Sequence, residues 1–288
     1  MINLSTSIKA TSWNRVIMSG LLLILMLTGC LAGPPSAAPV VSTSQASVTL
    51  RISGAGGTTI ILEAVQPAFE LTRPDYRLEV LAGTGTSGGV KGVMQGVLDV
   101  AAMSRPPTEE EVAQNLAYTQ FGQAGQAIIT HLDVGVTNLT KAQIKAIFTG
   151  RVSNWTEVGG PNLPLILYVR DEDDTSTKVL RQFVVGDTPF PETMAQVLTS
   201  QGDMLTAVAG TPGSIGIVNW PAAVAKQAKV QAVTLDGLAP NSSTYPMLSQ
   251  YGLGYLDKRQ AEIQPLIDWL KSESGRAALQ KFQVITAP

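Results

Sequence analysis

The chain has very few of the residues that most often hold metals or activate nucleophiles: one cysteine, Cys30, and one histidine, His131, in 288 residues. A single cysteine excludes a disulfide within the chain and a metal cluster built on several cysteines. Catalysis by a Ser–His–Asp triad or by histidine-bound zinc would depend on His131 alone. This residue closes a predicted strand over 126–131, and we interpret its role as structural. The sequence therefore predicts no metal site, no cofactor and no enzymatic activity.

The chain also has no apolar run long enough to cross a membrane. Its most apolar segment, over 16–27, falls short of the roughly 20 residues of a membrane-spanning helix. Lys9 and Arg15 are the only charged residues before residue 30. A basic start followed by a short apolar run is typical of a secretory signal peptide, which we place at residues 1–29.

The end of this apolar run, Leu27-Thr28-Gly29-Cys30, resembles the lipobox of bacterial lipoproteins. The resemblance implies cleavage before Cys30, attachment of lipid to its sulfur, and a protein anchored to a membrane at the cell surface or in the periplasm. The alternative is an ordinary signal peptide followed by an unrelated cysteine. Residues 31–47 are uncharged and rich in Pro, Ala and Ser, so 30–47 is predicted to be the lipidated cysteine and a flexible tether.

A strong excess of charge of either sign is absent too, since the formal net charge is −2. Removal of Lys9 and Arg15 with the predicted signal peptide would shift it to −4. A mildly acidic protein has no general attraction for nucleic acid. If this chain binds an anion, local dipoles must supply the attraction.

What the sequence does contain is an alternation of strand-like and helix-like segments. Strands are predicted over 48–53, 77–81, 98–103, 126–131, 165–169 and 214–218, and helices over 58–71, 88–95, from 108, 141–148, 177–185, 261–271 and 274–281. This order predicts an α/β fold with a largely parallel sheet. Because the alternation occurs in two successive units, we expect two lobes with a cleft between them.

Three of the strand-to-helix turns carry hydroxyl groups, and the first two of them also carry glycines. Ser53–Thr59 offers Thr58 and Thr59, Gly83–Gly89 offers Thr86 and Ser87, and the third strand ends in Ser104 and Arg105. Ligands of open α/β sheets bind beyond the carboxyl ends of the strands. Free N–H groups at helix N-termini favour an anion there. We therefore expect an anion site formed by these six residues.

The second turn also fits the dinucleotide-binding pattern G-x-G-x-x-G over 83–88. That reading requires an acidic residue at the end of the next strand. Here Ser104 and Arg105 occupy this end, and Asp99 lies near the start of the strand instead. We therefore do not favour a dinucleotide site.

The chain resembles the phosphate-binding proteins of bacterial ABC transporters over nearly all of residues 48–288. The matching segments are SGAGGTT (53–59), GTGTSGGVK (83–91), LDVAAMSRP (98–106), the stretch from LT to IFTG (139–150), SNWTEVGG (153–160), GSIGIV (213–218) and PLIDWLKSESG (265–275). The resemblance implies a periplasmic-binding-protein fold of two α/β lobes, joined by two crossover strands around an interdomain cleft. It places the first lobe at 48–132 plus 232–288 and the second at 133–231.

The resemblance also implies individual ligand contacts. The family's threonine in the first turn falls on Thr58, with the next backbone N–H at Thr59, and the serine in its second turn falls on Thr86. The family's arginine falls on Arg170, whose guanidinium could bind two ligand oxygens at once. The alternative for Arg170 is an ion pair at the surface with the acidic residues that follow it.

This chain differs from the family at two places. Some members have an aspartate after the third strand that accepts the proton of hydrogen phosphate, whereas this chain has Ser104 followed by Arg105, an arrangement also common among relatives. The family usually reads Arg-x-x-x-Ser-Gly-Thr, whose Ser and Thr bind oxygens, whereas this chain has Asp174, Thr175 and Ser176 at those positions. Three roles remain open for the acidic run: capping the next helix, accepting a proton shared with the ligand, or binding a metal such as calcium.

We therefore expect a monomer that binds phosphate or a related tetrahedral oxyanion and delivers it to the permease of an ABC transporter. The alternatives are a binding protein for another oxyanion or an organic phosphate, and a surface sensor or adhesion protein with the same fold.

Overall fold

A computed structural model of the chain describes residues 48–286. The predicted signal peptide, the lipidation site at Cys30 and the tether over 30–47 lie outside the described residues and remain predictions. Within the described range, none of the helices combines the length and apolar character needed to span a membrane.

The first part of the chain alternates strand and helix, as predicted. Its three strands are parallel and lie in the order β2–β1–β3. The elements are β1 (Val48–Gly54), α1 (Gly56–Thr72), β2 (Tyr76–Val80), α2 (Gly85–Met94), β3 (Val100–Met103) and α3 (Glu109–Ala113). α1 and α2 begin earlier than predicted because the glycine-rich turns already form the first turns of these helices. The sequence Thr108-Glu-Glu-Glu111 has the form of a capping box, and the structure confirms it at the start of α3, where Thr108 and Glu111 exchange side chain-to-backbone hydrogen bonds of 3.2 and 2.7 Å.

A second set of parallel strands lies in the order β8–β6–β7. The elements of this part are β5 (Asn138–Leu139), α4 (Lys141–Phe148), β6 (Ile166–Arg170), α5 (Thr175–Leu180), β7 (Ala195–Leu198), α6 (Gln201–Gly210), β8 (Ser214–Asn219), α7 (Trp220–Ala225) and β9 (Gln231–Leu235). Short 3-10 turns occur at Leu132–Val134, Trp155–Val158 and Asp257–Arg259. The helix predicted over 177–185 is α5 followed by a π-helical turn at Arg181–Val185.

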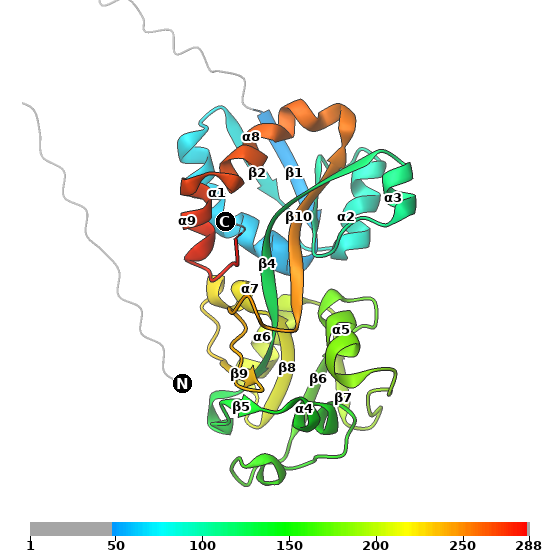
Figure 1. The fold of residues 1–288 in the computed structure, drawn as a ribbon, viewed down its shortest axis with the longest axis vertical. Helices are drawn as coiled ribbons and strands as arrows, with labels where there is room; N and C mark the ends of the chain where they lie inside the picture. The colour runs from blue at the N-terminus through cyan, green and yellow to red at the C-terminus, as the bar shows by residue number, and fades with distance from the viewer. Residues whose placement is uncertain (1–47, 287–288) are drawn as a thin grey trace, which may run out of the picture. The chain divides into compact units, whose positions relative to one another are not determined.

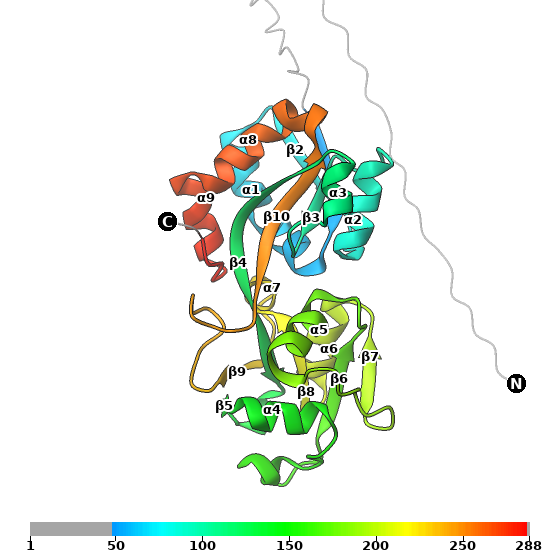
Figure 2. The same ribbon diagram turned by 45° about the vertical axis from the view of Figure 1, so that its right-hand side comes forward.

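Two long strands run from one set to the other (Figures 1 and 2). β4 (Leu116–Thr130) pairs antiparallel with β10 (Leu248–Leu256) and, further along, with β8 and β9. The sheet order is therefore β2–β1–β3–β10–β4–β8–β6–β7. The prediction of a largely parallel sheet is wrong at this crossing, because β4 and β10 enter the sheet against the direction of their neighbours. The chain ends in α8 (Gln260–Lys271) and α9 (Glu273–Gln280), close to the predicted bounds.

The buried apolar residues form separate clusters on the two sides of this crossing. One large cluster takes its members from 50–124 and 251–284, and the other large cluster from 128–247. The chain thus passes from one cluster to the other within β4, and it returns between Met247 and Tyr251, near the start of β10. The predicted lobe boundaries, 132/133 and 231/232, remain predictions.

His131 follows directly after β4, and its Nδ1 accepts a hydrogen bond of 3.1 Å from the backbone N–H of Asp133. This contact caps the 3-10 turn over 132–134 and agrees with the structural role predicted for this histidine.

The turn after β1 requires a glycine at position 54. Gly54 has φ of +147°, and a Cβ there would lie 2.1 Å from the carbonyl oxygen of Ala102 on β3. Gly54→Ala should therefore lower the free energy of unfolding by about 1–3 kcal/mol. Gly210→Ala is the control, because a Cβ at Gly210 meets nothing within 4 Å. Urea unfolding followed by circular dichroism measures both, and equal midpoints for the two variants would contradict the argument.

Candidate functional site

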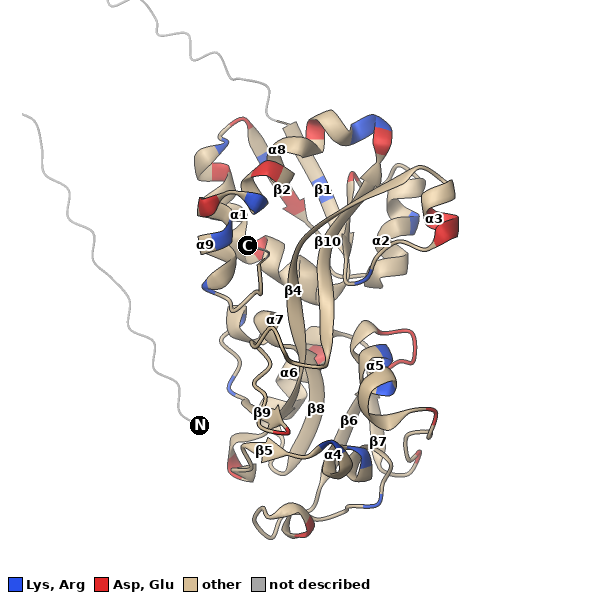
Figure 3. Cartoon of the chain, in the orientation of Figure 1, with Lys and Arg blue, Asp and Glu red and all other residues tan. Residues whose placement is uncertain are grey.

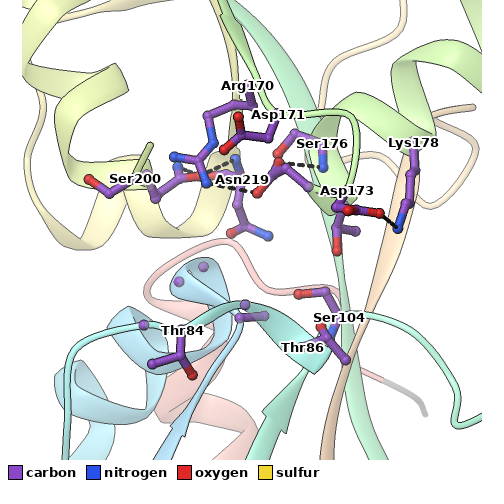
Figure 4. Close-up of a pocket in the computed structure, with 18 of the residues that line it drawn as sticks. Thr84, Thr86, Ser104, Arg170, Asp171, Asp173, Ser176, Lys178, Ser200 and Asn219 are labelled. Atoms are coloured by element: carbon purple, nitrogen blue, oxygen red, sulfur yellow. Dashed lines mark hydrogen bonds and ion pairs between the residues drawn. The ribbon is translucent and has the colours of Figure 1, made fainter. Parts of the chain in front are cut away.

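The turns that follow the strands of both parts of the sheet meet around one cavity of about 460 Å³. Its walls come from the turns after β1, β2 and β3 on one side and after β6, β7 and β8 on the other, with Gln126 of β4 between them. Figure 4 shows Thr84, Thr86 and Ser104 facing Arg170, Ser200 and Asn219 across this space. The position is the one expected from the carboxyl-end rule for α/β sheets.

Two helix N-termini on the first side have no side-chain cap. Neither Ala55 before α1 nor Thr84 before α2 forms a side-chain hydrogen bond to its helix, and neither helix has an acidic residue in its first turn. Both of these helix starts line the cavity. Uncapped N–H groups and the positive end of the helix dipole favour an anion at this side.

The predicted contacts Thr58 and Thr59 do not line the cavity. The side chain of Thr58 is fully buried, and its Oγ1 donates to the carbonyl oxygen of Met103 at 3.3 Å. The N–H of Thr59 donates to the carbonyl of Ala55, and its Oγ1 donates to the carbonyl of Gly56. Their hydrogen-bonding groups are thus used within α1 and against the end of β3, and the first turn offers the cavity its glycine backbone instead.

The hydroxyl residues of the second and third turns do line the cavity. Thr86, Ser87 and Ser104 all face it. Thr86 Oγ1 accepts a hydrogen bond of 3.2 Å from the backbone N–H of Ser104, which ties the starts of the two turns together.

Arg105 reaches the edge of the same cavity, but its guanidinium is already paired. Glu111 of α3 accepts two hydrogen bonds from it, both of 2.8 Å. The pair holds the pKa of Glu111 below its ordinary value, because Arg105 donates to the ionised carboxylate. Arg105 therefore adds little unpaired charge to the cavity as it stands.

Arg170, at the end of β6, lies on the opposite side with only 11% of its side chain exposed. Its Nη2 forms an ion pair of 2.9 Å with Asp174 Oδ2. Its Nη1 is buried and finds no partner among the described residues. One terminal nitrogen of the guanidinium, Nη2, is thus paired with a carboxylate, and the other, Nη1, is a buried donor without an acceptor.

Asp174 has a second partner besides Arg170. Its Oδ1 accepts a hydrogen bond of 2.9 Å from the N–H of Ser176, which makes it the N-cap of α5. The capping interpretation is thus confirmed, and Arg170 does pair with an acidic residue that follows it, but this pair lines the cavity and is mostly buried. Among residues 48–286, no group of three or more His, Cys, Asp or Glu side chains is placed to hold a metal ion.

Thr175 and Ser176 line the cavity as well. Ser176 Oγ donates to Gln126 Oε1 at 2.9 Å, and Gln126 Nε2 donates to Ser249 Oγ of β10 at 2.7 Å. The start of α5 is therefore joined by hydrogen bonds to both crossing strands.

Several lining residues are absent from the sequence-based prediction. Among them are Thr84, Gln126, Lys178, Thr199, Ser200, Gln201 and Asn219. Asn219 ends a strand that was predicted, so the carboxyl-end rule could have found it. β7 was not predicted, and the residues that follow it therefore carried no signal.

The charged residues of the cavity balance each other. Three basic side chains, Arg105, Arg170 and Lys178, line it together with three acidic ones, Asp171, Asp173 and Asp174. Figure 3 shows acidic and basic residues close together around the start of α5. An anion would thus be held by directed donors rather than by an excess of positive charge.

Comparisons with known proteins agree with this architecture. A family model for the PBP superfamily domain matches residues 39–274. The phosphate-binding protein PstS of Bacillus subtilis is 28% identical over 239 residues, which cover 80% of this chain and 77% of that protein.

Solved structures of other proteins share this architecture. A protein from Clostridium perfringens described as a phosphate ABC transporter substrate-binding protein, solved with bound phosphate, matches with a TM-score of 0.74 and 26% identity, over 83% of this chain and 100% of that one. The ABC-type phosphate transport receptor of Vibrio cholerae, at 23% identity and a TM-score of 0.61, covers the same shares of the two chains and shares the fold.

Proposed function

The chain belongs to the PBP superfamily, and from this membership we propose that it binds phosphate, or a closely related tetrahedral oxyanion, and delivers it to the permease of an ABC transporter. The fold predicted from the resemblance, a two-lobed periplasmic-binding-protein fold, is confirmed by the similarity to such structures. The relatives described as phosphate-binding proteins support phosphate as the ligand.

The observation that carries the proposal is the unpartnered Nη1 of Arg170. A buried donor without an acceptor costs about 1–3 kcal/mol, and more when it is charged. An oxyanion oxygen in the cavity would remove this cost, and the uncapped starts of α1 and α2 across the cavity would donate to other oxygens. The arrangement therefore favours a compact ligand with several acceptor oxygens.

The remaining contacts are assigned around this donor. The hydroxyl groups of Thr86, Ser87, Ser104 and Thr175 can each donate to an oxygen of the ligand, and Ser176, whose hydroxyl group donates to Gln126, is placed beside the ligand as part of the start of α5. Arg105, whose guanidinium is paired with Glu111, is placed at the edge of the site and is assigned no direct contact with the ligand.

Reversible binding without covalent chemistry is the activity that this lining supports. The residues described at the cavity include neither a histidine nor a cysteine, so its serines have no neighbouring imidazole to act as a base. This agrees with a family of substrate-binding proteins.

We place the protein outside the cytoplasm, as a monomer anchored by lipid at Cys30. The proposal rests on the signal-like segment over 1–29 and the lipobox-like sequence that ends it.

The first prediction from this proposed function concerns Arg170. Arg170→Ala should weaken phosphate binding by roughly tenfold to a hundredfold, because charged hydrogen bonds are worth about 1.5–3 kcal/mol. Arg170→Lys should recover part of the loss, since it restores the charge but not the fork of donors. Arg73→Ala is the control, because Arg73 pairs with Asp75 and does not line the cavity. Isothermal titration calorimetry with phosphate gives the affinities, and an unchanged value for Arg170→Ala would exclude contact with the ligand.

The second prediction concerns Asp174, which we propose accepts a proton of the bound ligand. Each carboxylate oxygen has two lone pairs, so Asp174 can accept from a P–O–H group while bound to Arg170 and Ser176. Sulfate carries no proton near neutral pH and would meet repulsion only. Asp174→Ser should therefore keep phosphate binding and bind sulfate more tightly than the wild type does. Asp174→Asn should show the same change to a smaller degree.

A purely structural Asp174 gives a different result. As a helix cap alone, its replacement would change the free energy of unfolding by about 1 kcal/mol and leave selectivity unchanged. Titration of wild type and both variants with phosphate and sulfate separates these outcomes. Equal binding of the two anions by the wild type would rule out the proton-acceptor role.

The third prediction concerns the anchor. Cys30→Ser should abolish lipid attachment and release the protein from membrane fractions. Metabolic labelling with a fatty acid, followed by fractionation, measures both effects. Lipid label on the Cys30→Ser protein would contradict the assignment.

A further inference from the structure

Asn219, at the junction of β8 and α7, contributes a polar side chain to the cavity that the proposed contacts do not use. It lines the cavity, and only 3% of the residue is exposed. Its Oδ1 caps α7 by accepting a hydrogen bond of 3.3 Å from the N–H of Ala222. The hydroxyl group of Tyr251, on β10, donates to the same Oδ1.

These two partners fix the orientation of the amide group. A backbone N–H can only donate, so the atom that faces Ala222 must be the oxygen. Burial raises the pKa of Tyr251 well above its ordinary value, so its hydroxyl stays protonated and remains a donor. Nδ2 must then point away from both partners, and it donates to no group within residues 48–286.

The free amide nitrogen lies beside the start of α1. A Cβ on Gly57 would be 2.6 Å from Asn219 Cγ and 2.9 Å from Nδ2. Because Gly57 has no side chain, the amide group can approach the uncapped first turn of α1. Figure 4 shows Asn219 between Arg170 and the opposite wall.

The backbone of Asn219 is held in place as well. Gln201, the first residue of α6, accepts from the N–H of Asn219 and donates to its carbonyl oxygen, both at 3.4 Å. Side chain and backbone are thus fixed by three elements, α6, α7 and β10. A donor positioned in this way loses little conformational entropy when it binds a ligand.

We propose that Asn219 is a ligand-binding residue, whose Nδ2 donates a hydrogen bond to an unprotonated oxygen of the bound oxyanion. The inference rests on the proposed function. It adds a neutral donor to the site, at the point where the first turn of α1 meets the opposite wall. The competing role is structural, in which Asn219 only caps α7 and receives the hydroxyl of Tyr251.

The variant Asn219→Asp separates the two roles. Aspartate keeps the oxygen that caps α7 and accepts from Tyr251, and it replaces the amide donor by a second oxygen that repels an anion. Affinity for inorganic phosphate should therefore fall by roughly tenfold or more in the folded variant, and its melting temperature should also fall, because the new carboxylate is buried. Asn219→Ser, which keeps a capping hydroxyl and lacks the amide, should lose about tenfold.

Asn154→Asp is the matched control. Asn154 also caps a turn, accepting from the N–H of Thr156 at 3.0 Å, and it does not line the cavity. Its affinity for phosphate should equal that of the wild type. The measurement is calorimetric titration of the full chain with inorganic phosphate, together with the melting temperature of each variant.

Wild-type affinity in both folded Asn219 variants would overturn the inference and leave the proposed function standing. If Asn219→Asp does not fold, Asn219→Ser decides alone by the same criterion. A wild-type protein that does not bind phosphate would refute the proposed function, and the inference with it.

Discussion

The pairing of β4 with β10 is the constraint on which the rest of the structure depends. β4 is antiparallel to β10 over Leu116–Gly125 and then to β8 over Gln126–Thr130, so a single strand belongs to both parts of the sheet. The parallel strands on either side end toward this crossing, and their turns therefore face each other around one cavity. The crossing strands also reach the site directly, because Gln126 bonds to Ser176 and Tyr251 bonds to Asn219. Any movement of one lobe relative to the other must be accommodated close to these contacts.

Electrostatics at the cavity follow from how its charges are paired. Lys178 and Asp173 pair at 3.2 Å on the exposed side, where such a pair contributes about 0–1 kcal/mol. Arg170 and Asp174 are mostly buried, and removal of either partner would leave an uncompensated charge. Asp174 thus neutralises much of the arginine before any ligand arrives. Two nitrogens at the cavity that have no acceptor among the described residues, Arg170 Nη1 and Asn219 Nδ2, are directional donors. They define the ligand more closely than the net charge does.

The sequence predicted the parts of the fold that depend on local patterns. Helix α4 and the capping box of α3 were placed correctly, because hydrophobic periodicity and capping residues are local signals. β10 was missed because Gly252 and Gly254 interrupt its pattern. A Cβ at Gly252 would lie 2.1 Å from the ring of Tyr118 on β4. Glycine is therefore required at this position because of a residue more than a hundred positions away in the sequence. No local pattern carries that information.

The same limit applies to the candidate site. Thr86 and Ser104 were found because each follows a predicted strand, Arg170 and Asp174 were placed by the resemblance to the family, and the structure brings all four to one cavity. Thr58 was expected at the ligand because the predicted helix began at this residue and because the family's threonine falls on it. The earlier start of α1 moves it inside the helix, where Met103 receives its hydroxyl group. The start of a helix is not resolved to within two residues by sequence patterns. A difference of this size thus decides whether a side chain faces the cavity or the core.

The proposed donors and the proposed acceptor together restrict the protonation state of the ligand. Arg170 Nη1 and Asn219 Nδ2 can only donate, so each requires an oxygen with a free lone pair. The carboxylate of Asp174, bound to Arg170 and Ser176, can only accept, so it requires a protonated oxygen. A tetrahedral oxyanion that carries both kinds of oxygen satisfies all three groups at once. Phosphate meets this condition near neutral pH, since its second pKa is far closer to neutrality than its third, whereas fully ionised sulfate leaves Asp174 facing a negative oxygen. Under these assignments, selectivity arises from the direction of individual hydrogen bonds, in a cavity whose formal charges cancel.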